Sequence, residues 1–195
     1  FGKVQTNLLV EGFYTILDDV FALRDMDDAA DGGKVKERYN GSGATVRGFN
    51  VEGRAAFTRW FELQAGVTLQ QSRYKEPEFW SEDAEVPPVR RMFRTPDAYG
   101  YFTASFKPVR NFTADLSGTC TGSMLVQHMA GSGVAQDVAV STPSFFDMNI
   151  RLSYDVRIYK EITMQLYGGV QNLFNAYQKD FDKGVDRDSG YIYGP

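Results

Sequence analysis

The run SFFDMNIRLSYDV, from Ser144 to Val156, alternates apolar and polar residues almost without exception. A period of two predicts a β-strand with one apolar face and one polar face. Strands in soluble sheets usually have about 5 or 6 residues, whereas a tilted strand that crosses a bilayer needs about 9 to 11. The length of the run therefore favours a membrane-spanning strand. Its apolar set is Phe146, Met148, Ile150, Leu152, Tyr154 and Val156, and its other set is Phe145, Asp147, Asn149, Arg151, Ser153 and Asp155.

The same alternation recurs in six further segments. We predict seven long strands and an all-β fold, an antiparallel up-and-down segment of a transmembrane β-barrel. The six other segments are Val4–Ile16, Phe49–Thr58, Phe61–Gln70, Ala98–Phe106, Phe112–Met124 and Ile162–Gln171.

Average composition gives a different impression. The chain has 195 residues, 24% of them charged, a net charge of −4 and a mean hydropathy of −0.36. These values are typical of a soluble domain, but a spanning barrel has similar averages because half of every strand is polar. Residues 1–195 carry no linker, so we expect one domain. Cys120 is the single cysteine, which excludes an internal disulfide. Without an initiator Met or signal peptide at Phe1, we expect a fragment or a processed product.

Short and long connections alternate along the chain. Only a few residues separate Phe57 from Phe61, Phe106 from Phe112 and Val156 from Ile162. In outer-membrane barrels short turns face the periplasm and long loops face the exterior. The alternation therefore predicts that the short turns lie together at one end of the strands and the long loops at the other end. The long connections are Leu17–Gly43, Tyr74–Asp97, Leu125–Pro143 and Asn175–Pro195.

Aromatic residues gather near both ends of the predicted strands. Such belts are typical of the two membrane interfaces, although aromatic residues also favour strands in general. The residues expected at the short-turn end are Phe57, Trp60, Phe61, Phe106, Phe112 and Tyr159, and those expected at the other end are Tyr74, Phe93, Tyr99, Phe145, Phe146 and Phe174.

One segment resembles a known family. The sequence YGGVQNLFNAY at Tyr167–Tyr177 is similar to the penultimate-strand motif of TonB-dependent outer-membrane receptors. Gly43–Gly53 and Arg94–Asp97 resemble strand motifs of the same barrels, and Gln178–Pro195 resembles their final extracellular loop. Complete receptors have a plug domain inside a barrel of about 22 strands. The resemblance implies that this chain is a C-terminal part of such a barrel, without the plug and the closing strand.

The resemblance also implies a function. TonB-dependent receptors take scarce, large solutes across the bacterial outer membrane, with energy delivered through TonB to the plug. We expect a ferric siderophore as cargo, with haem, cobalamin and glycans as alternatives. The expected partners are outer-membrane lipid, the plug, the TonB complex acting through the plug, and the solute. The polar strand faces would form part of the lumen wall, and the candidates for plug contacts are Glu52, Arg54, Asp115, Asp147 and Arg151.

A candidate solute site lies in the second long loop. Arg90, Arg91 and Arg94 follow Trp80 and flank an aromatic residue, a combination suited to an anionic ferric complex because guanidinium groups donate two parallel hydrogen bonds. Two alternatives remain open: binding of lipopolysaccharide phosphates, or pairing of these arginines with the acidic residues of the same loop. Those residues are Glu82, Asp83 and Glu85.

His128 is the single histidine, and it lies in the third long loop. A solvated loop histidine is the favoured interpretation. The alternative, a haem or metal ligand, makes His128 a candidate solute-binding residue. Two acidic clusters could supply oxygen ligands to calcium, but neither has EF-hand spacing, so a solvated loop is favoured there too. The clusters are Asp25, Asp27, Asp28 and Asp31, and Asp180, Asp182, Asp186 and Asp188.

Catalysis is not indicated. One histidine cannot form a two-His metal site, and the serines share no motif with a His/Asp pair. We expect no enzyme activity, no bound metal or cofactor, and no nucleic-acid partner.

A different class of function stays open at this point. In a soluble, lipocalin-like carrier the apolar stripes would line an internal calyx. Alternation alone does not separate inside from outside. Strand length, the order of the loops and the Tyr167–Tyr177 motif favour the receptor, and the same motif disfavours a nonspecific porin.

Overall fold

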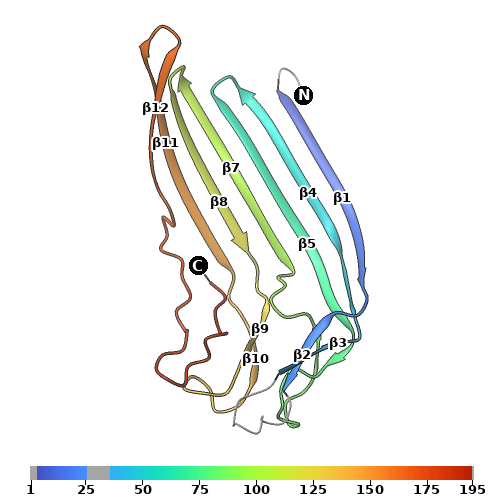
Figure 1. The fold of residues 1–195 in the computed structure, drawn as a ribbon. Helices are drawn as coiled ribbons and strands as arrows, with labels where there is room; N and C mark the ends of the chain where they lie inside the picture. Colours follow the sequence, from blue (N-terminus) through green and yellow to red (C-terminus); the bar gives the residue numbers. More distant parts are fainter. Residues whose placement is uncertain (1–3, 26–35, 195) are drawn as a thin grey trace.

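Seven long antiparallel strands form one curved sheet in the computed structural model, which describes residues 4–25 and 36–194 (Figure 1). Each long strand pairs with the next long strand along the chain, in the order β1-β4-β5-β7-β8-β11-β12. The seven predicted strands are therefore confirmed. They are β1 (Gln5–Leu17), β4 (Ala44–Thr58), β5 (Phe61–Glu78), β7 (Ala98–Val109), β8 (Phe112–Thr121), β11 (Phe145–Tyr159) and β12 (Ile162–Val170).

In the described parts of the long connections there are five short strands, which the sequence did not indicate. β6 (Val89–Arg91) pairs with the far end of β5. Two hairpins form apart from the main sheet, β2 (Phe21–Asp25) with β3 (Lys36–Asn40) and β9 (Leu125–His128) with β10 (Val138–Ser141). Within the described residues, no helix is long and apolar enough to cross a membrane.

The connections separate by length, as predicted. Two residues join β4 to β5, β7 to β8 and β11 to β12, and these turns lie together at one end of the sheet (Figure 1). The described parts of the long connections and the short strands lie at the other end, the loop end. At the last turn, Lys160 has a positive φ of 42°. Such turns match the right-handed twist of the strands that they join.

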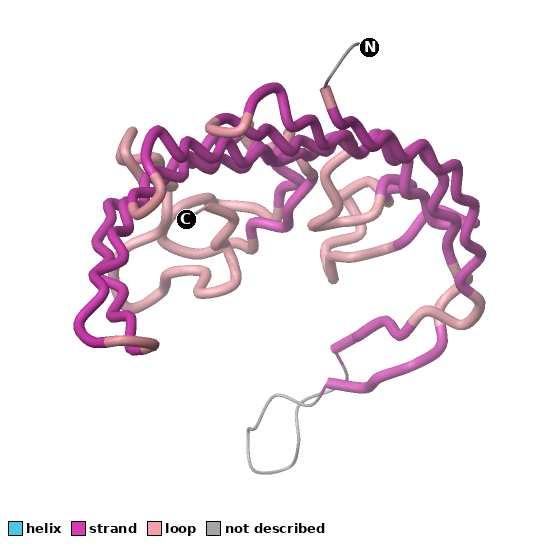
Figure 2. The backbone as a smooth tube through the Cα atoms, turned by 90° about the horizontal axis from the view of Figure 1, so that it is seen from above, coloured by secondary structure: helices cyan, strands magenta, loops and turns pink. Residues whose placement is uncertain are grey.

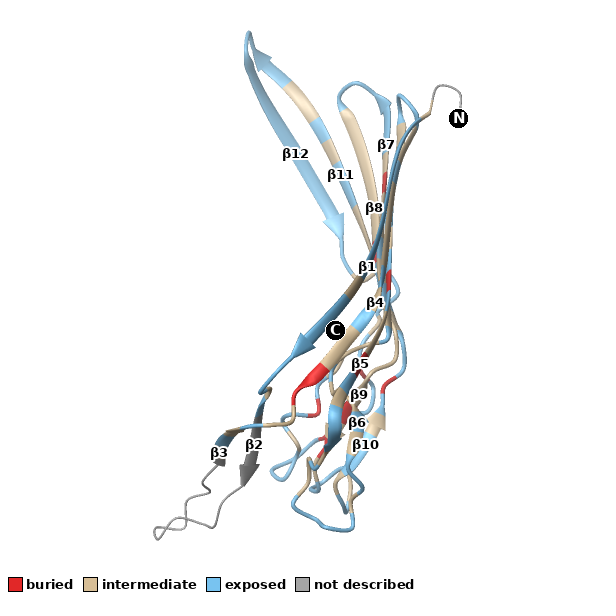
Figure 3. Ribbon diagram, turned by 90° about the vertical axis from the view of Figure 1, so that its right-hand side faces the viewer, coloured by how far each residue is buried: buried red, intermediate tan, exposed pale blue. Residues whose placement is uncertain are grey.

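The register keeps the two residue sets on separate faces. Between β11 and β8, Leu152 lies opposite Ala114, and Arg151 lies opposite Asp115. Because every strand is in register with its neighbour, one face of the sheet is apolar and the other is polar. Side chains of the apolar face are largely exposed, for example Leu152 at 43%. Figure 3 shows the long strands as mostly exposed or intermediate.

The polar face is the concave one. Figure 2 shows the sheet as an arc, with the loops and the C-terminal segment on its inner side. Phe145 belongs to the polar-face set, and its ring lies 5.9 Å from that of Tyr193 in this C-terminal segment. The apolar stripes are therefore convex. A lipocalin-like calyx would require the opposite arrangement, so the sheet does not fit that alternative.

Aromatic residues form the expected cluster at the turn end. The Phe61 ring stacks between Phe57 at 5.5 Å and Phe106 at 4.7 Å, with Trp60 at 6.1 Å. The belt expected at the loop end is only partly correct. Phe146 contacts Phe174 at 5.8 Å on the convex face.

Other members of the expected loop-end belt do not lie on that face. Tyr99 lies opposite Thr68 and Phe145 lies opposite Thr121, both in the polar set. Tyr74 and Phe93 line a pocket among the loops. Proximity to a strand end did not reveal which face each ring would take.

Candidate functional site: the inner wall and the loop-end mouth

The inner wall is the polar, concave face of the sheet. The strand register places all five residues predicted to face a plug on this one face. For example, Arg54 lies opposite Gln64, and Gln64 lies opposite Thr103 on the next strand. In the same way, Ser105 lies opposite Asp115, and Asp115 lies opposite Arg151. Their contact with a plug remains a prediction. The five are Glu52, Arg54, Asp115, Asp147 and Arg151.

Several of these side chains already have partners within the sheet. Arg54 forms an ion pair with Glu62. The Gln64 amide donates to Glu52 at 3.1 Å. The Ser105 hydroxyl donates to Asp115 at 2.6 Å. Arg54, Glu52 and Asp115 therefore each have a hydrogen-bond partner within the sheet.

Asp147 and Arg151 differ from these three residues. The Arg151 guanidinium lies 4.8 Å from the centre of the Tyr167 ring, a cation–π contact. One Asp147 oxygen accepts from Asn149 at 3.1 Å, while the other, Oδ1, is buried and has no partner. A buried carboxylate oxygen without a donor costs free energy. Asp147 is therefore the member of the set that most needs a donor from outside the sheet.

The Tyr167–Tyr177 motif ends the last strand and turns the chain inward. Asn172 and Asn175 have positive φ values of 50° and 51°, a conformation that asparagine tolerates better than most residues. The Asn172 side chain accepts from the N–H of Ala176 at 2.7 Å and donates to its carbonyl at 2.9 Å. These bonds close a compact turn, after which the C-terminal segment lies on the concave side (Figure 2).

His128 holds this C-terminal segment in place. Its ring stacks on Tyr191 with centroids 3.7 Å apart and planes 5° apart, and its Nε2 lies 3.0 Å from both oxygens of Asp182. The side chain is only 6% exposed. The favoured interpretation of a solvated loop histidine is therefore wrong. The prediction that His128 contacts solute remains a prediction, and it would require the segment to move.

The second acidic cluster binds groups of the protein itself. Asp182 accepts from the Asp188 N–H at 3.0 Å, and this bond together with that to His128 lowers the pKa of Asp182. Burial disfavours the charge of Asp180, but hydrogen bonds from Tyr193 and Tyr191 outweigh it and lower the pKa. Burial and the Asp180 carboxylate raise the pKa of Tyr191 to about 12.

These contacts bear on the calcium question. The solvated loop that we favoured for the second cluster is wrong at Asp182, which is buried. In the part of the chain that the structure describes, no group of three or more His, Cys, Asp or Glu side chains is placed to hold a metal ion. The first acidic cluster lies outside the described residues, apart from the backbone of Asp25.

The three arginines of the second long loop point to different acceptors. Arg90 donates to the Lys75 carbonyl at 2.9 Å. Arg91 donates to the Ser123 carbonyl at 2.8 Å and pairs with Asp97 at 2.9 Å. Arg94 donates to two carbonyls of the C-terminal segment, one of them that of Ile192 at 2.8 Å. The structure does not gather these guanidinium groups around a single anion.

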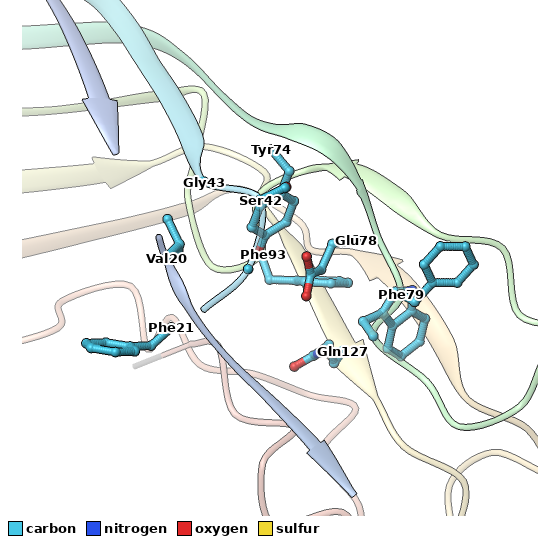
Figure 4. Close-up of a pocket in the computed structure, with 11 residues that line it drawn as sticks. Val20, Phe21, Ser42, Gly43, Tyr74, Glu78, Phe79, Phe93 and Gln127 are labelled. Carbon is cyan, nitrogen blue, oxygen red and sulfur yellow. The ribbon is translucent and has the colours of Figure 1, made fainter. Parts of the chain in front are cut away.

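A pocket does form close to them, at the loop end (Figure 4). Its volume is about 230 Å³. The rings of Trp80 and Phe93 meet edge to face at 5.4 Å, and the Glu78 carboxylate points into the space beside Phe93. The lining residues are Val20, Phe21, Gly41, Ser42, Gly43, Tyr74, Glu78, Phe79, Trp80, Phe93 and Gln127.

The pocket contains one predicted solute-binding residue, Trp80, and not the three arginines. Sequence reasoning missed Glu78, although the run Glu78-Phe79-Trp80 places a carboxylate next to two aromatic rings in a long loop. That run was the available signal. The contributions from the start of β2 and from β9 depend on loop packing, which no local pattern reveals.

Comparison with solved structures finds two longer chains with a similar arrangement of strands. The chain is similar to the closed form of the ferric-catecholate import receptor Fiu from K12 E. coli, with a TM-score of 0.57 and 19% identity over 95% of this chain and 23% of that one. It is also similar to the copper transporter OprC, with a TM-score of 0.62 and 13% identity over 99% of this chain and 26% of that one. No protein-family model and no curated protein matches the chain.

These similarities establish the fold. The chain spans about a quarter of the length of the two solved structures. Its seven strands have the architecture of one part of the barrels in these two structures, so the predicted fold class, an all-β, antiparallel up-and-down barrel segment, is confirmed.

Proposed function

We propose that residues 1–195 form a single segment of an outer-membrane active transporter, a TonB-dependent receptor that takes up a scarce, large solute. The segment supplies part of the lumen wall and part of the extracellular mouth. Its convex face contacts lipid, its concave face contacts the plug, and TonB acts through that plug. The protein is located in the bacterial outer membrane and is not an enzyme.

One observation carries this proposal: a sequence motif and a fold, obtained independently, coincide on the same strand. The motif at Tyr167–Tyr177 resembles that of TonB-dependent receptors, and it occupies the end of the last long strand of a sheet that matches receptor barrels. The convex face supports the membrane location. Its exposed side chains include Leu8 at 71%, Phe49 at 64% and Leu166 at 53%, an apolar surface that water would disfavour.

The first candidate cargo is a ferric siderophore. One similar structure is that of a ferric-catecholate import receptor, and the other is that of a copper transporter. Both support a metal-bound solute, and they differ in the metal. Haem, cobalamin and glycans are the alternatives within the same class of transporter.

A transport assay in cells tests the proposal. The full-length receptor is deleted and restored in its host, and uptake of radioactive iron is measured with a panel of ferric siderophores, with and without a functional TonB. We expect uptake of at least one complex to require both the receptor and TonB. Full-length protein recovered without detergent in the soluble fraction would contradict the membrane location, and uptake that continues without TonB would contradict the energised mechanism.

A further inference from the structure

We propose that the pocket around Glu78, Trp80 and Phe93 binds a cationic organic group of the transported solute, a protonated amine or a quaternary ammonium. This inference rests on the proposed function, because it assigns a chemical class to one contact of the cargo. The sequence suggested that the arginines bind an anionic metal centre of the solute. The pocket is proposed to bind a different group of the same solute.

The first argument is the charge of the pocket lining. Glu78 is the one charged residue among the eleven that line the pocket. The Tyr39 hydroxyl donates to Glu78 at 3.3 Å, which is long for a bond between two oxygens. No ion pair of Glu78 occurs within the described residues. A half-buried carboxylate with one weak donor attracts a cation and repels a carboxylate or catecholate.

The aromatic lining acts in the same direction. Tyr74, Trp80 and Phe93 line the space around the carboxylate, and the faces of such rings attract cations. Phe21, at the edge of the pocket, already attracts one: the Arg38 guanidinium carbon lies 6.0 Å from the centre of its ring. Rings around one carboxylate are a common way to bind ammonium groups.

The three arginines of the second long loop do not neutralise this pocket. The Arg90 guanidinium is bound to the Lys75 carbonyl, and that of Arg91 to Asp97 and the Ser123 carbonyl. Arg94 is bound to the C-terminal segment. None of the three lines the pocket. None of these three guanidinium groups therefore neutralises the Glu78 carboxylate.

Size and hydrogen bonding define the ligand group further. At about 230 Å³ the pocket is smaller than the usual range for a whole drug-sized ligand, about 300 to 1,000 Å³, so it holds one arm of a larger solute. The Trp80 indole nitrogen is buried and has no partner. An oxygen next to the ammonium group would accept its N–H.

Ligand-observed NMR on the full-length receptor in detergent tests the inference. Three probes are titrated: choline, its uncharged isostere 3,3-dimethylbutan-1-ol, and the anionic catechol 2,3-dihydroxybenzoate. Saturation-transfer signals give the affinity of each probe. We expect choline to bind at least tenfold more tightly than the isostere, and dihydroxybenzoate to show no saturable binding.

Variants locate the binding site. Glu78→Gln removes the charge of the carboxylate. We expect this variant to bind choline at least fivefold more weakly and to bind the isostere with unchanged affinity. Phe93→Leu removes an aromatic ring face, and we expect this variant to bind choline more weakly as well. Glu85→Gln is the matched control, because Glu85 is an exposed carboxylate of the same loop outside the pocket. Choline binding should be unchanged in this control.

Three results would overturn the inference: no saturable choline binding, equal affinity for choline and its isostere, or choline binding that neither pocket variant weakens. A catechol that binds and gains affinity in Glu78→Gln would assign the pocket to an anionic group instead. Any of these binding results would be compatible with the transport proposal, provided that uptake still requires TonB. Loss of TonB dependence with intact choline binding would instead refute the transport proposal and leave the pocket chemistry unchanged.

Discussion

At the residue scale, the docking of the C-terminal segment depends most on Asp182. Its carboxylate is buried between the Asp188 N–H and the His128 ring, each at 3.0 Å. Hydrogen bonds to a charged group contribute about 1.5 to 3 kcal/mol each. Asp182→Asn keeps the shape but removes the charge, so we expect the docked state to weaken.

Hydrogen-exchange mass spectrometry of the full-length protein measures this change. We expect amide exchange in residues 182–190 to accelerate about tenfold or more in Asp182→Asn, since about 1.4 kcal/mol corresponds to a factor of ten. Asp186→Asn is the control, because the exposed Asp186 takes part through its carbonyl, which accepts from Ser132. Equal acceleration in both variants would contradict the role of Asp182.

The same contacts predict a pH dependence. Bonds from the Asp188 N–H and His128 lower the pKa of Asp182 below 3.8, and the tyrosine hydroxyls lower that of Asp180. A lowered pKa means that the charged form is stabilised in the docked state. The contribution is therefore complete above about pH 4 and is lost as the pH falls through the lowered pKa values.

A nitroxide label on Ser189→Cys, with Cys120→Ser, reports the mobility of the segment by electron paramagnetic resonance. We expect an immobile label from pH 7 down to about pH 4 and increasing mobility below that. Adding Asp182→Asn should raise the mobility at neutral pH as well. A label that becomes mobile between pH 7 and pH 5 would show that a different group controls the docking.

The sequence did not reveal these residue-scale contacts. His128 and Asp182 are separated by 54 positions, and their contact depends on how a loop hairpin meets the C-terminal segment. The three arginines illustrate the same limit. Their spacing suggested one anion site, but each guanidinium found a carbonyl or carboxylate of the protein itself. Composition indicates the available chemistry, and loop packing decides which partner each group finds.

At the element scale, Gly118 allows β8 to pack closely. A Cβ built at this position would lie 2.4 Å from Cε1 of Phe102 and 3.2 Å from the Asp147 carbonyl oxygen. Gly118→Val must therefore displace the Phe102 ring, and overpacking of this kind costs about 1 to 3 kcal/mol. We expect a lower thermal unfolding midpoint for the full-length protein in detergent. The midpoint is measured from the heat-dependent change in its migration on gels.

Gly168→Ala serves as the control for this prediction. Gly168 lies in β12, and no atom lies within 4 Å of a Cβ built there. The midpoint of this variant should stay the same or rise slightly, because alanine loses less backbone entropy than glycine. A midpoint for Gly118→Val equal to that of the unaltered chain would show that the ring does not cover Gly118.

The long strands were predictable because a period of two survives in every one of them. Each strand has 9 or more residues, so a single exception does not obscure the pattern. The short strands have 3 to 5 residues, too few for alternation to be recognised. They also form by pairing with distant segments, as β6 does with the far end of β5. Their existence is a property of the loop assembly rather than of the local sequence.

At the scale of the whole molecule, the sheet is an arc with two unpaired edges. Within the described residues β1 pairs on one side with β4, and β12 pairs on one side with β11. Exposed edges of this length attract further strands. The arc, its convex apolar face and its polar concave face are the features that the proposed wall between lipid and a plug requires.

The proposed function requires the apolar face of this wall to meet lipid. The most direct test uses the full-length protein with Cys120→Ser in bilayers. Nitroxide labels are placed one at a time along β11, from Phe146 to Val156. Collision with oxygen, which concentrates in lipid, is compared with collision with a water-soluble nickel complex. We predict that oxygen accessibility peaks at Met148, Ile150 and Leu152 and falls at the residues between them. Peaks of nickel accessibility at those three positions, or no alternation at all, would contradict the claim.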